Sequence, residues 1–376
     1  MGVLKGVRIL EIAGIGPGPF CAMLLADLGA EVISIERPAT AARNRAAQIT
    51  QRGKKSVVLD LKQPEAVDAV LRLAGNADAL IEGMRPGVAE RLGIGPDACF
   101  ARNPALVYGR MTGWGQQGPL SQAAGHDSNY TALAGALWFA SPAGQPPVAP
   151  STLLGDIGGG ALYLALGIVA GVLRAREDGR GQVVDAAIVD GAAHMMNLLL
   201  GMIAARGTGF ERGAGFEASH WAARSYRCAD GQWINLASLE PQFYAELVRR
   251  LGLADDPAFA AGHMDREAWP GLTERLAVLF AGHDRAHWCA ILEGSDACFA
   301  PVLSPPQAAQ HPHMMARGVY STIDGVLQAN PAPRFSATPS RPLRSISARG
   351  AHTREVLAEA GLDPGAIDRL AARAGA

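Results

Sequence analysis

Two segments of the chain place a proton-transfer group beside residues that control the local backbone. Gly125-His126-Asp127 carries an imidazole, and Gly155-Asp156 carries a carboxylate ahead of the glycine run at 158–160. An imidazole titrates near neutrality and can act as a general base. An aspartate that opens a helix is also a favoured N-cap, and an isolated histidine is often structural. From these residues alone, structural and acid–base roles both stay open.

A third carboxylate, Glu240, comes directly before Pro241, which suits the first position of a helix. A capping or surface role would explain Glu240 without any chemistry. The glycines after Asp156 are harder to explain locally, because each one lowers helix stability. Glycine is used where a backbone or a ligand must approach closely, so this run predicts such an approach beside the Asp156 carboxylate.

Basic side chains cluster around the ends of the early predicted strands. A single surface cation needs no function, but guanidinium groups suit phosphate oxygens, and ligands of open α/β sheets bind at one sheet edge. The set therefore indicates a phosphorylated ligand such as CoA. Its members are Arg37, Arg52, Lys54, Lys55, Arg85 and Arg91.

Cofactor-dependent alternatives fit the sequence less well. The turn from Gly14 to Pro19 has the wrong spacing for a dinucleotide site, and its prolines remove backbone donors that would hold a pyrophosphate. A pyridoxal-phosphate enzyme needs a Schiff-base lysine, and all four lysines lie within the first 62 residues. His311 and His313 have no cysteine or carboxylate cluster nearby. We therefore expect neither a cofactor nor a metal.

The composition is that of a well-packed globular protein. Hydrophobic residues make up 49% and charged residues 18% of the 376 residues, and the net charge is −1. This balance supports neither a nucleic-acid partner nor a membrane partner. The five cysteines lack paired spacing and the amino terminus lacks a signal-peptide pattern, so we expect a reduced, cytoplasmic protein. The uncharged stretch 157–173 predicts a buried core helix.

Strand and helix signals alternate through the first half of the chain, which predicts an α/β fold with a parallel sheet and helices on its faces. After residue 200 the rhythm changes to α+β, and a hairpin around Asp230-Gly231 begins that part. We assign 1–200 to a large domain, 201–224 to a connector, 225–325 to a small domain and 326–376 to a return segment that completes the large domain. Strands are predicted at 7–14, 31–38, 56–62, 77–83, 105–113 and 182–188, and helices at 21–30, 64–75, 157–176, 191–207 and 353–362.

Taken together, these segments resemble the family III CoA-transferase superfamily and, within it, the branch of α-methylacyl-CoA racemases. The resemblance covers most of the chain up to about residue 303. GHD-x-NY at 125–130 and EPQFY at 240–244 are specific to the racemase branch. The other matching stretches are AGIGPGPFCAMLLADLGAEV (13–32), VVLDLK (57–62), RPGVAERLGIGP (85–96), RMTGWGQQGP (110–119), LLGDIGGG (153–160), GQVVDAAIVDG (181–191) and SDACFAPVL (295–303).

The resemblance implies a Rossmann-like large domain, a smaller α+β domain and two chains interlocked as a homodimer. Acyl-CoA would lie between the large domain of one chain and the small domain of the other. By matched position, His126 and Asp156 are the bases for the two enantiomers, and Glu240 pairs with the histidine across the dimer. The positions that match the CoA site are Arg37, Leu59, Asp60, Leu61, Gly83, Met84, Arg85, Arg91, Gly125, Asp127, Asn129 and Tyr130.

The reaction implied is interconversion of (2R)- and (2S)-2-methylacyl-CoA thioesters through an enolate. We expect the amides at the helix start near Asp156 to stabilise the enolate oxygen. The alternatives are a class III CoA-transferase, in which Asp156 forms a mixed anhydride, and an acyl-CoA-binding protein without turnover. The segment 213–226 departs from the racemase pattern, so the acyl pocket can differ there, with Glu217 and His220 adding polarity.

Overall fold

The computed structural model describes residues 2–38, 45–141, 144–207, 209–212, 220–340 and 342–374. The chain divides into two compact units. The large unit consists of Met1–Leu137, Ala149–Asn197 and Gly318–Ala376, and the small unit consists of Trp138–Val148 and Leu198–Arg317. Residues 138–148, which belong to the first half of the sequence, thus group with the small unit.

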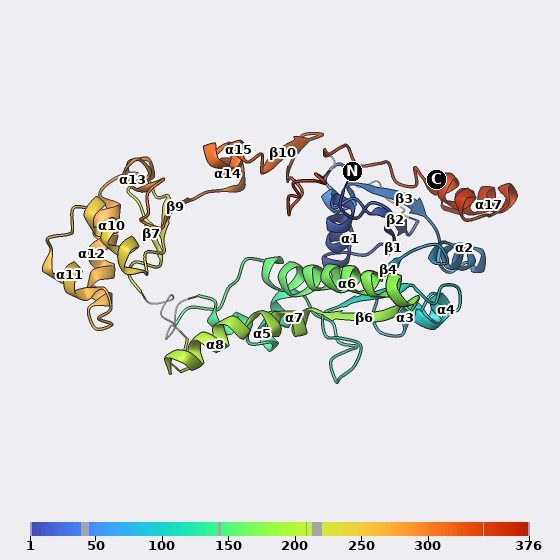
Figure 1. The fold of residues 1–376 in the computed structure, drawn as a ribbon, viewed down its shortest axis with the longest axis horizontal. Helices are drawn as coiled ribbons and strands as arrows, with labels where there is room; N and C mark the ends of the chain where they lie inside the picture. The colour runs from blue at the N-terminus through green and yellow to red at the C-terminus, as the bar shows by residue number, and fades with distance from the viewer. Residues whose placement is uncertain are drawn as a thin grey trace. The chain divides into compact units, whose positions relative to one another are not determined.

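A six-stranded sheet forms the centre of the large unit (Figure 1). Its order is β3-β2-β1-β4-β5-β6, and every neighbouring pair is parallel, which confirms the predicted α/β class. This is the order of doubly wound nucleotide-binding folds, which bind ligands where the order reverses, between β1 and β4. The strands are β1 Arg8–Ile12, β2 Glu31–Glu36, β3 Lys54–Val58, β4 Ala79–Glu82, β5 Val107–Thr112 and β6 Gln182–Ala187.

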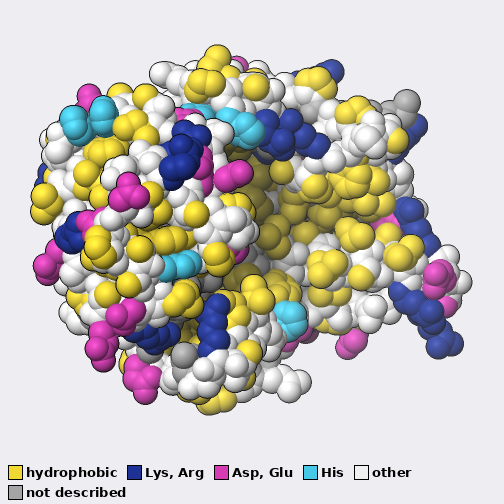
Figure 2. Space-filling view, turned by 60° about the vertical axis from the view of Figure 1, so that its left-hand side comes forward, with side chains coloured by type: hydrophobic (Ala, Val, Ile, Leu, Met, Phe, Trp, Pro, Cys, Tyr) yellow, Lys and Arg dark blue, Asp and Glu magenta, His cyan; other side chains and the backbone are white. Residues whose placement is uncertain are grey.

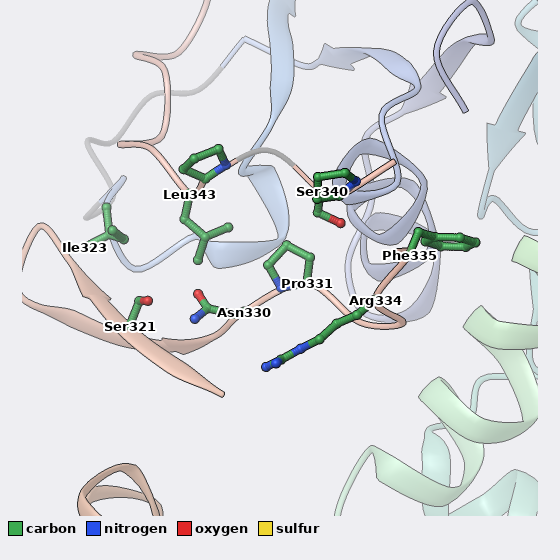
Figure 3. A pocket seen from close by; sticks show the side chains of 10 residues that line it. Ser321, Ile323, Asn330, Pro331, Arg334, Phe335, Ser340 and Leu343 are labelled. Atoms are coloured by element: carbon green, nitrogen blue, oxygen red, sulfur yellow. The ribbon is translucent and has the colours of Figure 1, made fainter. Parts of the chain in front are cut away.

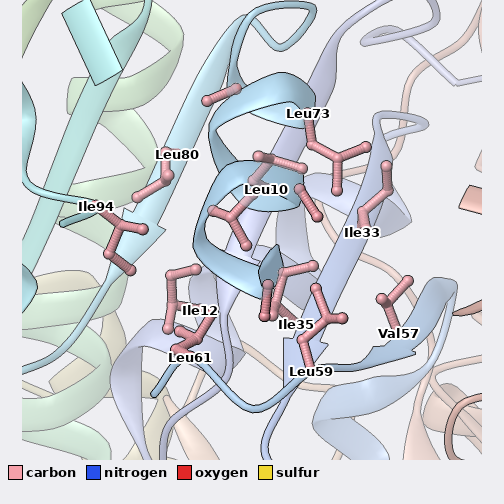
Figure 4. Close-up of a cluster of buried hydrophobic side chains, with 14 of the residues drawn as sticks. Leu10, Ile12, Ile33, Ile35, Val57, Leu59, Leu61, Leu73, Leu80 and Ile94 are labelled. Atoms are coloured by element: carbon pink, nitrogen blue, oxygen red, sulfur yellow. The ribbon is translucent and has the colours of Figure 1, made fainter. Parts of the chain in front are cut away.

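Helices cover both faces of this sheet. Helices α1 and α6 bury Leu25 and Ile168 against one face. On the other face, Leu73 of α2 packs against Leu10, Ile33 and Leu80 of the strands (Figure 4). The helices of the large unit are α1 Pro17–Asp27, η1 Ile49–Gln51, α2 Pro64–Ala74, α3 Val88–Arg91, α4 Pro96–Phe100, α5 Asp127–Leu133, η3 Leu153–Ala161, α6 Leu162–Asp178, α7 Ile188–Met195, α16 Thr353–Glu359 and α17 Pro364–Ala374.

The C-terminal segment attaches to the open edge of β3. The Ser56 amide donates to His352 Nδ1 at 3.1 Å, and the His352 amide donates back to the Ser56 carbonyl at 3.0 Å. The Val58 amide donates to Thr353 Oγ1 at 3.1 Å. Backbone groups at the edge of β3 are therefore hydrogen-bonded to a loop and to the start of a helix, and are not open to another strand. A hairpin of β10 Tyr320–Ile323 and β11 Val326–Ala329 precedes this segment.

Two helical stretches, Leu153–Asp178 and Ile188–Arg206, are long and apolar enough by length and composition to cross a membrane. The first begins as the π-helix η3 and continues as α6. It buries its inner side on the sheet, but Leu166 and Leu173 on the outer side are 67% and 65% exposed. The expectation of a buried core helix is therefore wrong for the outer side. The predicted helix 191–207 is also divided, after Met195, into α7 and α8.

The small unit has an antiparallel sheet of order β7-β8-β9, packed against helices. The predicted hairpin at Asp230-Gly231 is confirmed, because β7 and β8 pair antiparallel and Gly231 adopts a φ of +76°. Trp221, Leu276 and Phe280 lie at the centre of the core. The elements are η2 Ala136–Phe139 at the boundary with the large unit, α8 Asn197–Arg206, β7 Ser225–Arg227, β8 Trp233–Leu236, α10 Pro241–Arg250, α11 Pro257–Gly262, α12 Trp269–Ala281, α13 Arg285–Leu292, β9 Phe299–Val302, α14 Pro305–Gln310 and α15 Pro312–Ala316.

Candidate active site

Many of the predicted site residues lie in loops at the carboxyl ends of the parallel strands. Arg37 follows β2, Leu59–Leu61 follow β3, and Gly83–Arg85 follow β4. Because the strands are parallel, these loops share one edge of the sheet. That edge includes the reversal between β1 and β4, where ligands of open α/β sheets bind.

The six basic residues grouped from the sequence do not all lie at this edge. Arg52, Lys54 and Lys55 stand at the beginning of β3, hence at the opposite edge of the sheet. Their nearest carboxylate oxygens are those of Asp27 at 2.5 Å, Glu11 at 2.6 Å and Glu355 at 2.8 Å, respectively. Grouping these three with a phosphate site is therefore wrong, because they hold the fold together.

The other three cations remain candidates for phosphate binding. Arg37, Arg85 and Arg91 are exposed, and none of them forms an ion pair with a carboxylate in the part of the chain that the structure describes. Arg37 follows β2, and the other two belong to the segment after β4. An unpaired guanidinium at a ligand edge suits an anionic group, since it loses no existing partner on binding.

The leucine side chains of the Leu59–Leu61 segment are buried, whereas the Gly83–Arg85 segment exposes the Arg85 side chain. Leu59 and Leu61 are 1% and 7% exposed and pack in the core shown in Figure 4. Asp60 Oδ1 accepts the Lys62 amide at 3.1 Å and shapes the turn. In the second segment, the Met84 amide donates to Glu82 Oε2 at 2.6 Å. A ligand at this edge would meet backbone atoms rather than the leucine side chains.

His126 is the N-cap of α5, and its side chain is exposed. Its amide donates to Asn129 Oδ1 at 3.0 Å. The buried Tyr130 donates its hydroxyl to the Gly125 carbonyl and packs edge-on against Trp114, with ring centroids 4.7 Å apart. Asn129 and Tyr130 thus fix the backbone on which the imidazole stands. A Cβ at Gly125 would lie 2.6 Å from the Tyr130 ring, which explains the glycine.

Asp156 lies in the first turn of the π-helix η3 and is half-buried. The Ile157 amide donates to the Thr152 carbonyl at 3.0 Å, the five-residue step of a π-helix. Thr152 itself adopts a φ of +64°, which is uncommon for a residue other than glycine. Irregular turns of this kind are frequent at functional sites. A Cβ at Gly16 would lie 3.5 Å from Asp156 Oδ2, so the glycine turn after β1 adjoins this carboxylate.

Asp127 joins the histidine segment to the aspartate segment. It is 8% exposed, and its Oδ1 accepts the Gly155 amide at 2.8 Å and the Asp156 amide at 2.7 Å. A Cβ at Gly155 would lie 2.6 Å from the same oxygen, so a larger residue cannot occupy that position without a shift. The Gly155 and Asp156 amides are therefore already used by Asp127, and an enolate oxygen would have to be met by other amides of this helix start.

Burial and neighbouring charge tune the Asp156 carboxyl. Burial raises the pKa of Asp156, the negative charge of Asp127 raises it further, and the charge of His126 lowers it. Burial and the Asp156 charge also raise the pKa of Tyr130. A carboxyl group that keeps its proton closer to neutrality is suited to acid–base chemistry. The structure thus places the His126 imidazole close enough to Asp156 to act on its carboxyl group, whose pKa is raised.

The remaining glycines of η3 serve helix packing. A Cβ at Gly159 would lie 2.7 Å from the Ala192 amide nitrogen, and one at Gly191 would lie 1.9 Å from the Gly159 carbonyl oxygen. Helices η3 and α7 therefore touch backbone to backbone. The predicted close approach is confirmed. At Gly159 the group that approaches is the backbone of α7, and at Gly155 it is the Asp127 side chain.

Glu240 is the N-cap of α10 in the small unit, and its side chain is exposed. In the part of the chain that the structure describes, its carboxylate has no hydrogen-bond partner. The backbone before it is firmly held, since Ser238 Oγ donates to the Ala297 carbonyl at 2.6 Å. His263 Nε2 donates to the Leu239 carbonyl at 3.0 Å.

The altered segment before the small-unit hairpin is described only in part. Glu217 lies outside the described residues, as do its neighbours from 213 to 219. His220 is fully buried, and its Nε2 donates to the His263 carbonyl at 2.8 Å. Its Nδ1 accepts the Ala222 amide at 2.9 Å. The expectation that His220 adds polarity to an acyl pocket is therefore wrong, because both ring nitrogens are used inside the small-unit core.

Residues 4–353 match the domain of CoA-transferase family III. The chain belongs to this family. It is 40% identical to the alpha-methylacyl-CoA racemase of Mus musculus and 39% identical to that of Homo sapiens, in each case over 98% of this chain and 96% of the relative. It is also 30% identical to the succinyl-CoA–D-citramalate CoA-transferase of Chloroflexus aurantiacus, over 95% of this chain and 93% of that protein.

Solved structures of the family share the fold. The crystal structure of Rv3272 from M. tuberculosis is 28% identical, with a TM-score of 0.76 over 94% of this chain and 98% of that one. A CAIB/BAIF family protein from Brucella suis has a TM-score of 0.82 over 96% of this chain and 99% of that one. At 23% identity, the second likeness bears on the fold alone.

The family III fold has the sheet order of dinucleotide-binding proteins, but its β2 end is used differently here. A dinucleotide site needs an acidic residue after β2 to accept the ribose hydroxyls. Glu36 stands at that place, yet its Oε1 and Oε2 each accept a guanidinium nitrogen of Arg45 at 2.9 Å. Ser56 Oγ donates to Glu36 Oε1 as well. Both oxygens of the Glu36 carboxylate are thus bonded within the protein.

A pocket of about 580 Å³ lies elsewhere in the large unit of this family III protein, within the segment 321–343 (Figure 3). Asn330, Arg334, Phe335 and Leu343 are among its lining residues. None of the site residues predicted from the sequence lines it.

Three groups near the site were missed from the sequence. Burial raises the pKa of Glu82 at the end of β4 to about 7, and Arg110 lies 3.8 Å from its carboxylate. Arg110 also donates to Gln116 Oε1 at 2.6 Å. A charged residue within each of two neighbouring buried strands, which normally carry none, could have pointed to Glu82 and Arg110. Gln116, in the loop after β5, carried no such signal.

Proposed function

We propose that this family III protein is an isomerase that interconverts (2R)- and (2S)-2-methylacyl-CoA thioesters. The observation that carries the proposal is the junction at Asp127. Its carboxylate accepts the Gly155 and Asp156 amides and so brings His126 and Asp156 together. The similarity to racemases of mouse and human extends over nearly the whole chain, and the residues of the junction lie within it.

The reaction needs two proton-transfer groups on opposite faces of the α-carbon. For one enantiomer, the neutral His126 imidazole takes the α-proton, and the C–H bonding pair moves into the thioester to form an enolate. The Asp156 carboxylic acid then returns a proton to the opposite face, and the enolate oxygen reverts to the carbonyl. For the other enantiomer the roles reverse. A general base of this kind contributes about 10²–10⁴-fold to the rate. No redox step and no cofactor enter the scheme.

CoA would lie along the carboxyl edge of the sheet. The exposed Arg37, Arg85 and Arg91 supply cations for the phosphates of CoA. The backbones of 59–61 and 83–85 border the same edge. CoA held in this way would direct its thioester toward Asp127 and the two proton-transfer groups beside it.

We further propose that the active protein is an interlocked homodimer in which Glu240 of one chain pairs with His126 of the other. Leu162, Leu166, Val169 and Leu173 form an exposed apolar stripe along α6 with exposed fractions of 47%, 67%, 38% and 65%. Such a stripe is typical of an interface. Hydrophobic side chains also form continuous areas in the space-filling view (Figure 2). The exposed Glu240 carboxylate has no hydrogen-bond partner among the described residues of its own chain, so it is available to a partner chain.

Isotope exchange tests the chemistry directly. The protein is incubated with (2S)-2-methyloctanoyl-CoA in D₂O without any added carboxylic acid, and C2 deuteration and configuration are followed by mass spectrometry and chiral chromatography. We expect deuterium at C2 together with inversion, and a loss of about 10²–10⁴-fold in Asp156→Asn. Absence of exchange by the wild-type protein would overturn the proposal.

A CoA-transferase is the second candidate, because the chain is also 30% identical to a succinyl-CoA–D-citramalate CoA-transferase. In that reaction the Asp156 carboxylate attacks the thioester carbonyl, CoA leaves as the thiolate and a mixed anhydride forms. The same assay separates the two, since a transferase needs an acid acceptor and leaves the α-hydrogen in place. An acyl-CoA-binding protein without turnover would bind the thioester and show neither change.

A further inference from the structure

We propose that Asp127 is the positioning residue of this site: its carboxylate fixes the backbone of Asp156 relative to His126. The proposal rests on the proposed function, and it assigns Asp127 a role other than contact with CoA. Asp127 directly follows His126, and its Oδ1 accepts both the Gly155 and Asp156 amides at 2.8 and 2.7 Å. One side chain therefore ties together the backbones that carry the two proton-transfer groups.

The geometry separates this role from ordinary helix capping. A capping aspartate accepts an amide of its own helix. The N-cap of α5 is His126, and the Asp127 carboxylate bonds instead to a segment 28 and 29 residues away. The side chain is 8% exposed, so little of it is available to a ligand. Gly155 is required there because a Cβ would lie 2.6 Å from Asp127 Oδ1.

The charge of Asp127 acts on Asp156 in addition to its hydrogen bonds. From α5, Asp127, His126 and Tyr130 face the Asp156 carboxylate. Helix α7, which packs on η3, carries Asp190 and His194. His194 Nδ1 instead pairs with the Tyr163 hydroxyl at 2.7 Å.

Strand β5, which also packs on η3, carries Arg110, but Arg110 donates to Gln116 and Glu90. Apart from Asp127 and His126, the packed elements add no charge that acts on Asp156. Asp190 acts on Asp185 of β6, and Asp185 accepts the Gln116 amide at 3.2 Å. On α1, Gly16 lies beside the carboxylate and the only charged residue, Asp27, pairs with Arg52 at the far end of the helix. On α6 the charged residues fall in the last turns, from Arg174 onward. Asp127 is thus the negative neighbour that favours the protonated form of Asp156.

Two substitutions separate the hydrogen bonds from the charge. Asp127→Asn keeps a side-chain oxygen that can accept both amides and removes the charge. Asp127→Ala removes both. Asp190→Asn is the matched control. It removes a negative charge from the neighbouring helix α7, and the Asp190 side chain does not bond to the Asp156 backbone. Steady-state kinetics of racemisation, with kcat and KM separated, are measured for all four proteins across pH.

We expect Asp127→Ala to lower kcat by about 10²-fold with KM close to wild type, since a small misplacement of a reacting group has that effect. Asp127→Asn should retain most of kcat, while the acidic limb of the kcat/KM profile moves to lower pH because the charge that raises the pKa of Asp156 is gone. The acidic limb moves in the same way for racemisation from the (2R) and from the (2S) thioester. In both directions the active form of the enzyme holds one proton between His126 and Asp156. Asp190→Asn should leave the profile where it is.

A CoA-binding role gives the opposite split, with KM raised and kcat unchanged, and this result would overturn the proposal. So would an Asp127→Asn profile that coincides with wild type. Hydrogen–deuterium exchange of the peptide covering 153–160 provides a readout that does not depend on catalysis. The Gly155 and Asp156 amides should exchange faster in Asp127→Ala but not in Asp127→Asn. If the wild-type protein does not racemise, the proposed function fails, and the exchange result still decides the role of Asp127.

Discussion

The two units hold their candidate carboxylates in contrasting ways. Asp156 of the large unit is half-buried in a π-helix, and its backbone is tied to Asp127 and packed against α7. Glu240 of the small unit is exposed at the start of α10, although Ser238 and His263 hold the backbone before it. The first carboxylate has its surroundings built into its own unit. The second is open to solvent and therefore accessible to another surface.

This difference explains why the two groups suit different tasks. A base or acid that must be tuned before substrate arrives needs a fixed, partly desolvated position, which Asp156 has. A carboxylate that only orients an imidazole can be brought to it by association, as proposed for Glu240. In this scheme the large unit supplies the tuned chemistry and the small unit of the partner chain completes it.

Mixing two inactive variants tests this division, with the largest expected effect. Asp156→Asn and Glu240→Gln homodimers are unfolded together, refolded and assayed for deuterium exchange. If each site takes Asp156 from one chain and Glu240 from the other, a mixed dimer contains one intact site. Half of the dimers are mixed, so activity should recover to roughly a quarter of the wild-type value.

Each variant refolded alone is the control and should stay inactive. If both residues of a site came from one chain, no mixed dimer would hold an intact site and no activity would return. That result would contradict the interlocked arrangement but leave the proposed reaction standing. Recovery in the mixture without a dimer in solution would contradict it as well.

The sheet could be predicted from the sequence because its signals are local. Alternating apolar runs and helical segments predict a parallel α/β sheet, and the structure has one. His126 and Asp156 could not be ranked above structural residues from their types, because the contact that joins them spans 28 residues and runs through a third side chain. The basic residues show the same limit, since spacing alone does not tell which end of a strand a cation occupies or whether a carboxylate already pairs with it.

The next largest effect concerns the backbone contact between η3 and α7, which lies beside Asp156 in the large unit. A Cβ at Gly191 would lie 1.9 Å from the Gly159 carbonyl oxygen, so Gly191→Ala must push α7 away from η3. Overpacking of this kind destabilises by about 1–3 kcal/mol. We expect a lower thermal midpoint and a kcat reduced more than KM is raised. Gly201→Ala on α8 is the control, because a Cβ there meets nothing within 4 Å and alanine favours the helix. Equal stability of both variants would show that the contact does not constrain the site.

The smallest effect concerns the support of Glu240. Burial lowers the pKa of His263, although its bond to the Leu239 carbonyl raises it, and burial also lowers the pKa of His220. Because the folded pKa lies below the unfolded value of about 6.5, the unfolded state binds more protons as pH falls through that window. The small unit should therefore be fully stabilised above about pH 6.5 and lose stability on acidification.

Urea unfolding at pH 7.5 and 5.5, followed by tryptophan fluorescence, measures this loss, since Trp221, Trp269 and Trp288 lie in the small-unit core. His263→Gln keeps a side-chain N–H for the Leu239 carbonyl but cannot titrate. It should reduce the pH-dependent part of the unfolding free energy, because one of the two histidines with a lowered pKa no longer titrates. If His263→Gln and wild type lose stability equally, His220 or another group carries the acid response, and His263 supports Glu240 through its hydrogen bond alone.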